Sequence, residues 1–589
     1  MTLFENNYEQ TLTASIGKGK YECEIAAGTL YRFKLNGEVI AYGPARAPHG
    51  YARIDRFEIH AQEPENEIMI EVVHYDTNSF YIPRIPGFVH IVICNSEKRA
   101  VLTEVDFKVS NSGPRNFDVE KFTGQRHIRE VYDFSRTFTY SMKPSEAPVP
   151  SFLEREAPMP DLSKIFTSTF HNGKFDFERV VTGFIRCRLL AGKDGCSLAI
   201  GFDEADFGDF PGKRAWWGKY EIVIDLPPFK ELDFESFEVY SLKYAAVEIR
   251  KGSADVSEMS IREYAFPEKE IIPPPKCADM PLMRAALETF RQNTLDTFMD
   301  SPCRERAAWL CDSFFTAKAS YLFTGNTHME ETFLENFLIP NSFPNIPAGM
   351  FPMCYPADTK NFIPQWAMWL ILQIDDYRKS RGGLHDYPHQ YEDRFRKFIR
   401  FFDPYVNSSG LLSNLPGWNF IEWSKAKDFI DGTHYPTNLL FSRVLEIMSE
   451  WYGDQGMVRR ADLIREEVFH TGMNDGRLWD NDSRMCSSEI AQYFALLFGG
   501  ARFSVIDFDS ASNCDVPCGL FIGQFLRFEI LLQKKRFEQL QNELETTFSK
   551  MVEMTGTLWE KKEPDSSCCH GFASYVANLL VAVEENTAR

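Results

Sequence analysis

The stretch IIPPPKCADMPLMRAALETFRQ, residues 271–292, marks the place where the apolar pattern of this 589-residue chain changes its period. Before it, short alternating or β-branched runs predominate, and such runs are typical of antiparallel strands. After it, apolar residues recur at helical spacing to the end of the chain. The sequence therefore predicts a β-rich N-terminal part followed by a helical C-terminal part.

The N-terminal part divides again at a proline-rich segment, EAPVPSFLEREAPMPDL, residues 146–162. Strand-like runs such as NEIMIEVVHYD and GKYEIVIDL lie on either side of it. A linker of this composition between two groups of strands indicates two domains. We expect an N-terminal β-sandwich over residues 1–150 and a second β-sandwich over residues 151–272.

About twelve segments after residue 273 fit the helix template. Sequential helical hairpins without intervening strands favour an (α/α)6 barrel over residues 273–589, in which six inner helices surround a cavity. An α-solenoid is the alternative, but the chain has no fixed-period repeat and its loops are uneven in length. The predicted helices cover residues 278–297, 303–323, 328–338, 363–381, 389–402, 421–430, 436–452, 455–468, 487–498, 517–533, 536–548 and 570–585.

The composition narrows the range of partners. A formal charge of −20 disfavours nucleic acid and acidic membranes, because phosphate binding needs a concentrated positive field. The 51 Phe and 10 Trp suit large cores and the flat surfaces on which sugar rings stack. We therefore expect a small carbohydrate or glycoside as the partner, and the oligomeric state stays open.

The first residues of the chain indicate its cellular compartment, and its cysteines indicate whether it holds disulfides or a metal. No basic and apolar leader opens the chain and no apolar run reaches membrane-spanning length, so we expect a cytoplasmic protein. Thirteen cysteines without a framework spacing favour reduced thiols. Cys568, Cys569 and His570 stand together, but without a C-x-x-C partner pair a zinc site is disfavoured. We expect neither a metal nor a cofactor.

An acidic motif, MDSPCRERAAWLCDSFF, follows the change of period at residues 299–315. Ser301 is a good N-cap and Pro302 suits the first helical position, so a helix is predicted to begin there. The charged and aromatic residues around this helix start are Asp300, Arg304, Glu305, Arg306, Trp309 and Asp312.

Three of these side chains, Glu305, Trp309 and Asp312, share one face of the predicted helix. A purely structural helix normally buries apolar residues on such a face. The alternative is a surface network in which the acids pair with Arg304 or Arg306.

A second acidic segment lies near the end of the chain in TGTLWEKKEPDSSCCHGFAS, residues 555–574. Glu560 follows Trp559 in a loop punctuated by Gly and Pro, and His570 opens the last predicted helix. In a barrel of this connectivity the second and last helices lie close around the ring. We therefore predict that Glu305 and Glu560 face each other across one cavity, which favours catalysis.

Both acidic segments resemble motifs of the bacterial α-L-rhamnosidases, glycoside hydrolase family 78. DSPCRERAAWLCD is similar to the motif Asp-Cys-Pro-Gln-Arg-Asp-Glu-Arg-Leu-Gly-Trp-x-x-Asp of that family. GTLWE and SSCCHGFAS are similar to its Thr-x-Trp-Glu and Ser-x-x-His stretches. YRFKLNGEVIAYGPARAPHGYARID and FESFEVYSLKYAAVEI resemble its β domains. GWNFIEWS, with Glu422 and Trp423, has the position of its mid-barrel Asp-Trp motif.

The resemblance implies a role for each matching residue, and a short form of the family that lacks the C-terminal sandwich. Glu305 matches the general acid and Glu560 the general base. The matching sugar-site residues are Asp300, Arg304, Asp312 and His570. The segment before Glu305 is one residue shorter than the family motif, which keeps open another sugar, or an epimerase, on the same barrel.

Two carboxyls in these roles hydrolyse a glycosidic bond with inversion when they lie roughly 6.5–9.5 Å apart, because a water then fits between base and sugar.

Four tryptophans are candidates for the apolar wall of the site, each with a core position as the alternative: Trp309, Trp418, Trp423 and Trp559. The segment EADFGDFPGKRAWWGKYE, residues 204–221, is either a long hairpin or a lid. A non-catalytic carbohydrate-binding protein is the remaining alternative.

Overall fold

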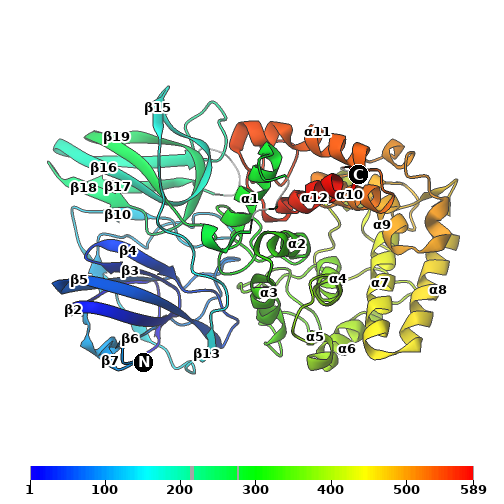
Figure 1. Ribbon diagram of the computed structural model, residues 1–589, viewed down its shortest axis with the longest axis horizontal. Helices are drawn as coiled ribbons and strands as arrows, with labels where there is room; N and C mark the ends of the chain where they lie inside the picture. The colour runs from blue at the N-terminus through cyan, green and yellow to red at the C-terminus, as the bar shows by residue number, and fades with distance from the viewer. Residues whose placement is uncertain (1, 213–217, 273, 275–276, 588–589) are drawn as a thin grey trace.

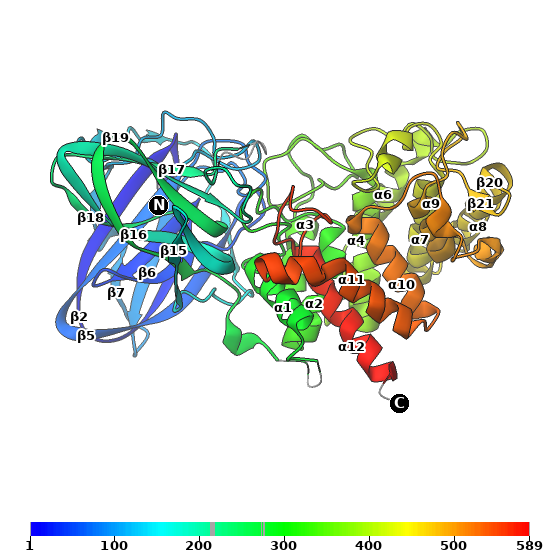
Figure 2. The ribbon, with the colours of Figure 1, turned by 90° about the horizontal axis from the view of Figure 1, so that it is seen from above.

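The structure is a computed structural model that describes residues 2–212, 218–272, 274 and 277–587. Two β regions lie on one side of the molecule and a helical domain lies on the other, as the sequence predicts (Figure 1). Figure 2 shows the same division from above. None of the described helices is both long and apolar enough to cross a membrane.

The first β region is an eight-stranded, mainly antiparallel sheet with the order β4, β3, β5, β2, β6, β7, to which β8 and β13 are added. Its longest strands, β2 and β5, carry a register break between Gly17 and Gly19. Leu12 and Ile25, on either side of this break, belong to one apolar core, so the bent sheet packs against itself as a sandwich. The strands are β2 (Tyr8–Ala27), β3 (Leu30–Leu35), β4 (Glu38–Gly43), β5 (Tyr51–His74), β6 (Val89–Asn95), β7 (Ala100–Thr103), β8 (Lys108–Ser110) and β13 (Ser151–Glu154).

The second β region is a seven-stranded sheet built on the antiparallel pair β16 and β19. Leu198, Ile200 and Phe202 alternate along β16 and are all buried in its core, as the two-residue period of a strand requires. The strands are β10 (Val131–Asp133), β14 (Ile165–Thr167), β15 (Thr169–His171), β16 (Lys174–Asp203), β17 (Glu221–Leu226), β18 (Glu231–Glu235) and β19 (Tyr240–Glu263).

Strand pairing crosses the predicted domain boundary at residue 150 in both directions. β10 precedes the boundary but pairs in parallel with β17 of the second sheet. β13 follows it but pairs in parallel with β5 of the first sheet. The segment between β10 and β13 therefore ties the two sheets together, and the division at residue 150 stays a prediction.

Helices that contact one another in succession make up the helical domain. Among the described helices, six form a closed ring in the order α2, α4, α7, α9, α10, α12, because α12 contacts α2 again. The helices are α1 (Pro281–Asn293), α2 (Asp312–Thr324), α3 (His328–Leu338), α4 (Pro364–Ser380), α5 (Tyr387–Gln390), α6 (Glu392–Phe401), α7 (Tyr435–Tyr452), α8 (Gln455–Gly472), α9 (Glu489–Phe498), α10 (Phe525–Gln533), α11 (Phe537–Thr555) and α12 (Val576–Thr587).

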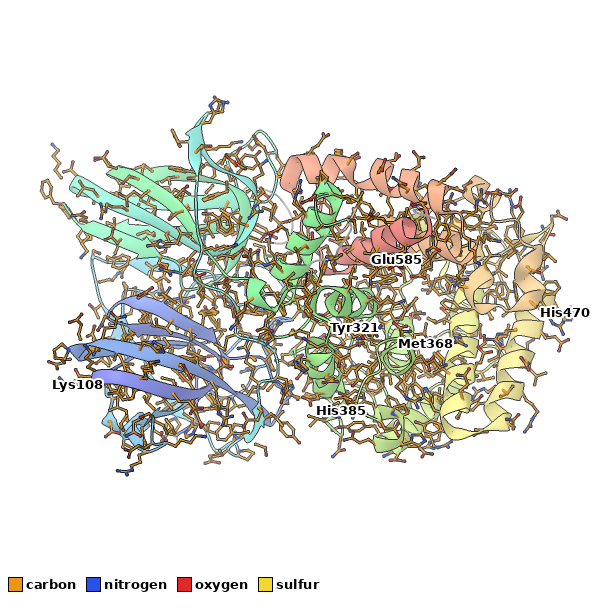
Figure 3. All side chains as sticks on the ribbon, in the orientation of Figure 1. Lys108, Tyr321, Met368, His385, His470 and Glu585 are labelled. Atoms are coloured by element: carbon orange, nitrogen blue, oxygen red, sulfur yellow. The ribbon has the colours of Figure 1, made fainter. Side chains whose placement is uncertain are left out.

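Outer helices cover this ring, as in the predicted barrel. α1 and α3 contact α2, α8 contacts α7, and α11 contacts α12. α6 packs on α7 through Phe395 and Trp451, whose ring centroids are 5.7 Å apart. Met368 of α4 is fully buried, whereas His470 and Glu585 lie on the outer surface (Figure 3). Ring closure excludes the α-solenoid.

The prediction of a helix from residue 303 is wrong, because α2 begins only at Asp312. The preceding residues form a loop in which Asp300 and Ala307 pair through their backbones, Asp300 donating its N–H to the Ala307 carbonyl. Arg306 and Cys311 have φ values of 55° and 70°, which a right-handed helix does not tolerate. The predicted helix 421–430 is likewise only a short 3-10 turn, Lys425–Phe429.

The predicted hairpin or lid, residues 204–221, connects β16 to β17, and residues 213–217 of it lie outside the described part of the chain. Its first residue is fixed to the helical domain, because Glu204 Oε2 accepts a hydrogen bond of 2.7 Å from the Cys568 N–H.

Candidate active site

A cavity of about 570 Å³ opens at the end of the ring where the inner helices begin. Its walls come from the segments before or at the start of α2, α4, α7, α10 and α12, and from Phe80 and Gln125 of the β-rich part. This volume is in the range of small-molecule sites. The predicted site residues that line it are Asp300, Arg304, Glu305, Trp309, Asp312, Trp423, Glu560 and His570.

The loop before α2 directs Glu305 into this cavity. Asp300 Oδ1 accepts a hydrogen bond of 2.8 Å from the Ala307 N–H and so closes the loop beneath Glu305. Arg306 points elsewhere, because its guanidinium lies 4.9 Å from the Tyr81 ring. The charge of Arg306 therefore does not pair with Glu305, contrary to the surface network considered from the sequence.

Arg304 contacts both predicted catalytic carboxyls. Its Nη2 lies 3.1 Å from Glu305 Oε1 and 3.2 Å from Glu560 Oε2. The carbonyl of Arg304 accepts a hydrogen bond of 3.0 Å from Thr123 Oγ1. The two acids, 255 positions apart in the sequence numbering, are thus close neighbours around one cation.

The pKa values of these two acids are shifted in opposite directions. Burial and the negative charge of Glu560 raise the pKa of Glu305. Arg304 and a 2.8 Å hydrogen bond from Trp309 Nε1 lower it, but the net shift is upward. Burial acts the same way on Glu560, but Arg304 and Lys561 help to offset it, and the pKa of Glu560 is lowered. A carboxyl that retains its proton to higher pH therefore lies beside one that ionises readily.

Three further polar residues surround the pair. Burial and neighbouring carboxylates raise the pKa of Asp300 and of Asp312 well above the ordinary value. His570 Nδ1 lies 3.8 Å from Asp312 Oδ1, but burial lowers the pKa of His570 to about 4, so near neutral pH this contact is not an ion pair. So many carboxyls suit a neutral ligand whose hydroxyl groups donate to them.

Aromatic side chains run from the acids to the mouth of the cavity. The Trp309 and Trp418 ring centroids are 6.3 Å apart, and those of Trp418 and Trp423 are 6.2 Å apart. Trp418 and Trp423 are 39% and 41% exposed, whereas Trp366 is 2% exposed. The aromatic wall is therefore deep at one end and open at the other, and it offers flat surfaces to a sugar ring.

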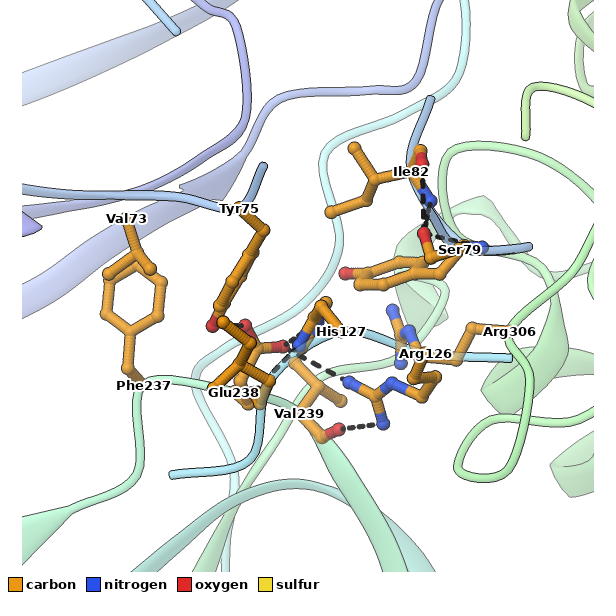
Figure 4. A network of polar contacts seen from close by, with 12 residues as sticks. Val73, Tyr75, Ser79, Ile82, Arg126, His127, Phe237, Glu238, Val239 and Arg306 are labelled. Atoms are coloured by element: carbon orange, nitrogen blue, oxygen red, sulfur yellow. Dashed lines mark hydrogen bonds and ion pairs between the residues drawn. The ribbon is translucent and has the colours of Figure 1, made fainter. Parts of the chain in front are cut away.

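Arg126, His127 and Glu238 form a buried polar network between the two β regions (Figure 4), and Arg126 links this network to the loop that carries Glu305. Arg126 donates to the Cys303 carbonyl at 2.9 Å and to Glu238 Oε2 at 3.1 Å. Glu238 Oε1 accepts a further hydrogen bond from Tyr75. Because Cys303 directly precedes Arg304, both β regions help to set the position of the acid loop.

Gln125, which the sequence reasoning missed, contacts the predicted acid. Its Nε2 lies 3.4 Å from Glu305 Oε1. Its own buried Oε1 has no hydrogen-bond partner among the described residues. The run FTGQRHIRE around it carries no motif, so no local signal reveals this role. Phe80 is missed for the same reason.

Two predicted site residues do not line the cavity. Trp559 is fully buried in the apolar core of the helical domain. Glu422 is also buried, and its Oε2 accepts hydrogen bonds from the N–H groups of Gly519 at 3.0 Å and Gly523 at 3.2 Å. Burial raises the pKa of Glu422 to about 7. Glu422 therefore anchors the segment before α10.

No three His, Cys, Asp or Glu side chains in the described part of the chain are grouped so that they could hold a metal ion. This holds for Cys568, Cys569 and His570 as well.

The sequence of residues 280–452 matches the family described as the bacterial alpha-L-rhamnosidase 6 hairpin glycosidase domain. The first part of the helical domain is therefore similar in sequence to a six-hairpin glycosidase domain of bacterial alpha-L-rhamnosidases. The resemblance carried by the acidic motifs is thereby confirmed. No curated protein matches the sequence significantly.

Solved structures share the architecture of this chain. The family 78 rhamnosidase of Bacillus sp. GL1 superposes with a TM-score of 0.82 over 98% of this chain and 90% of that one, at 15% identity. A Streptomyces avermitilis α-L-rhamnosidase complexed with L-rhamnose has a TM-score of 0.63, covering 97% and 61%, at 14% identity. A Klebsiella oxytoca rhamnosidase with rhamnose bound has a TM-score of 0.57, covering 72% and 89%, at 16% identity. At these identities the similarity shows a common fold.

Proposed function

We propose that this chain is a glycoside hydrolase that releases terminal L-rhamnose from glycosides or oligosaccharides with inversion. One observation carries the proposal: Glu305 and Glu560 contact the same Arg304, yet their pKa values shift in opposite directions. Acid–base hydrolysis needs one protonated and one ionised carboxyl at the same pH.

In this mechanism Glu305 donates its proton to the glycosidic oxygen as the bond to the sugar breaks. Trp309 donates to Glu305 Oε2 and Gln125 to Oε1, so both carboxyl oxygens are held in place. Glu560, as the carboxylate, removes a proton from the water that attacks the anomeric carbon. Asp300 and Asp312 accept hydrogen bonds from the sugar hydroxyls.

Inversion requires space for the attacking water between the base and the sugar. Inversion is proposed from the separate acid and base roles of the two carboxyls, and the anomeric configuration of the first product decides it. The sugar is proposed from the family match and from the L-rhamnose in the Streptomyces avermitilis complex, which has the same fold.

Proton NMR of the first product from an aryl α-L-rhamnoside tests the proposal. We expect an initial sugar of the opposite anomeric configuration to the substrate; net retention would make Glu560, or another carboxylate, a nucleophile. Cleavage of a different aryl glycoside instead would select another sugar on the same barrel. Binding of rhamnosides without turnover, unaffected by Glu305→Gln, would select a non-catalytic carbohydrate-binding protein.

A further inference from the structure

A second cavity, of about 410 Å³, lies in the helical domain outside the candidate active site. Its walls come from the segment that follows α3 and from α5 and α6, and it shares no lining residue with the active-site cavity. Its volume is within the range of small-molecule sites. Much of its lining is apolar and includes Leu338, Phe343, Ile346, Pro347 and Met350.

The guanidinium of Arg394, on α6, is the charged group that this lining holds most firmly. It lies between two rings, 4.9 Å from the centroid of Phe343 and 4.8 Å from that of Phe351, within the range of cation–π attraction. Its Nη1 donates a hydrogen bond to the Pro340 carbonyl. Its buried Nε has no hydrogen-bond partner among the described residues. The guanidinium is therefore fixed in place while much of its donor capacity is unused.

Arg394 has no acidic counter-ion in the described part of the chain. Burial lowers the pKa of Arg394 to about 10, and the groups that oppose this shift are two tyrosines, Tyr355 and Tyr391. At neutral pH the guanidinium is still a cation. Asp393, the acid in the same cavity wall, pairs instead with Lys397 at 2.6 Å. A partly buried cation without a carboxylate is costly, and an anion in the cavity would offset that cost.

The segment between α3 and α4 borders both cavities. Met350 lines the cavity of Arg394, and Met353 lines the active-site cavity. The Met353 carbonyl accepts a hydrogen bond of 3.0 Å from the Leu310 N–H. Because Leu310 belongs to the loop that carries Glu305, a molecule bound at Arg394 contacts a segment that is paired with the acid loop.

We propose that this second cavity binds a small organic carboxylate with an apolar body. The carboxylate pairs with Arg394 through charge-assisted hydrogen bonds, and the apolar body packs against Phe343 and Met350. A neutral ligand of the same shape leaves the charge of Arg394 unpaired, and inorganic phosphate has no part that fills the apolar lining. The inference does not rest on the proposed rhamnosidase activity, because the site is separate from the active-site cavity and its readout is binding.

Calorimetric titration with 3-phenylpropanoate tests the proposal, with 3-phenylpropanamide as its neutral isostere. We expect the carboxylate to bind, and Arg394→Gln to raise its Kd by about 10- to 100-fold, the range expected for hydrogen bonds to a charged group. The wild type should bind the amide more weakly by a similar factor. Arg396→Gln is the matched control, because Arg396 is on the same helix but contacts Tyr452 and does not line the cavity. It should leave the Kd unchanged.

Hydrogen exchange of the wild-type protein locates the ligand even if Arg394→Gln does not fold. Peptides that cover residues 341–350 should be protected when 3-phenylpropanoate binds. Protection confined to residues 418–427, in the wall of the active-site cavity, would place the ligand there and refute the proposal.

Four results of the titrations would overturn the proposal. They are no binding of 3-phenylpropanoate at millimolar concentration, equal affinity for the amide, an unchanged Kd in a folded Arg394→Gln variant, and inorganic phosphate that binds at the same site as tightly as the carboxylate.

Discussion

Replacing Arg304 by Met should move the whole pH profile of hydrolysis to higher pH. Arg304 contacts Glu305 and Glu560 at 3.1 and 3.2 Å and lowers the pKa of each. Unit charges about 4 Å apart at an effective dielectric constant of about 20 interact by about 4 kcal/mol, roughly three pKa units. Measured effects of one neighbouring opposite charge are about 1–3 units.

The sign follows from the two proposed roles. The acidic limb of kcat/KM reports ionisation of the base Glu560, and the alkaline limb reports deprotonation of the acid Glu305. Without Arg304 both carboxyls retain protons to higher pH, so both limbs should shift upward by about 1–3 units. Below the shifted acidic limb, activity should fall about tenfold per pH unit.

The assay is kcat/KM for an aryl α-L-rhamnoside between pH 3 and pH 9. Arg304→Lys keeps the charge and should retain a profile close to that of the wild type. Lys562→Gln removes a charge from the exposed loop outside the cavity lining and should move neither limb by more than a few tenths of a unit. Limbs that stay in place in a folded Arg304→Met variant, or that move in opposite directions, would refute the assignment of both carboxyls.

Three further outcomes are expected. Glu305→Gln and Glu560→Gln should each lower the rate of hydrolysis about 10²–10⁴-fold on a substrate with a poor leaving group. Only Glu305→Gln should regain activity on a substrate with a good leaving group, because such a group departs without a proton. Equal recovery of both variants would contradict the two roles. Trp309→Phe removes the hydrogen bond that lowers the pKa of Glu305, so the alkaline limb alone should rise by about one unit. The pKa of Glu422 is about 7 in the folded protein, above its unfolded value, so the stability contributed by its protonated form is lost as pH rises from about 4.5 through 7. The Tm should therefore decline over this pH range in the wild type, and Glu422→Gln should flatten the decline. An unchanged decline in the variant would contradict this role of Glu422.

The sequence predicted the architecture because both halves of the chain follow simple periods. The alternation in β16 and the helical spacing of segments such as α4 are long enough to outweigh local exceptions. The prediction failed at residues 303–311, where the local signals for a helix start at Ser301 and Pro302 were good. Tertiary contacts of this loop, such as that of Arg126 with Cys303, override that preference.

The candidate site was predicted in part, and its errors have a common cause. Trp559 and Glu422 each stand next to a residue that lines the cavity, Glu560 and Trp423. In an extended or irregular segment, neighbouring side chains point to different sides, so adjacency to a site residue does not indicate membership of the site. Gln125 could not be found because its contact with the acid loop spans 180 positions and depends on how two domains dock.

Because the β regions border the cavity, they limit which part of the chain can be exchanged with another protein in a chimera. Gln125 and Phe80 border the same cavity as the barrel acids, and Arg126 holds the acid loop through Cys303. A chimera that grafts this barrel onto a foreign N-terminal half would therefore inherit the two proposed catalytic glutamates, Glu305 and Glu560, without the amide of Gln125 and the guanidinium of Arg126 that position the loop of Glu305. A chimera that preserves activity must therefore have its crossover before residue 80, so that residues 80–126 stay with the barrel, or it must include the entire chain.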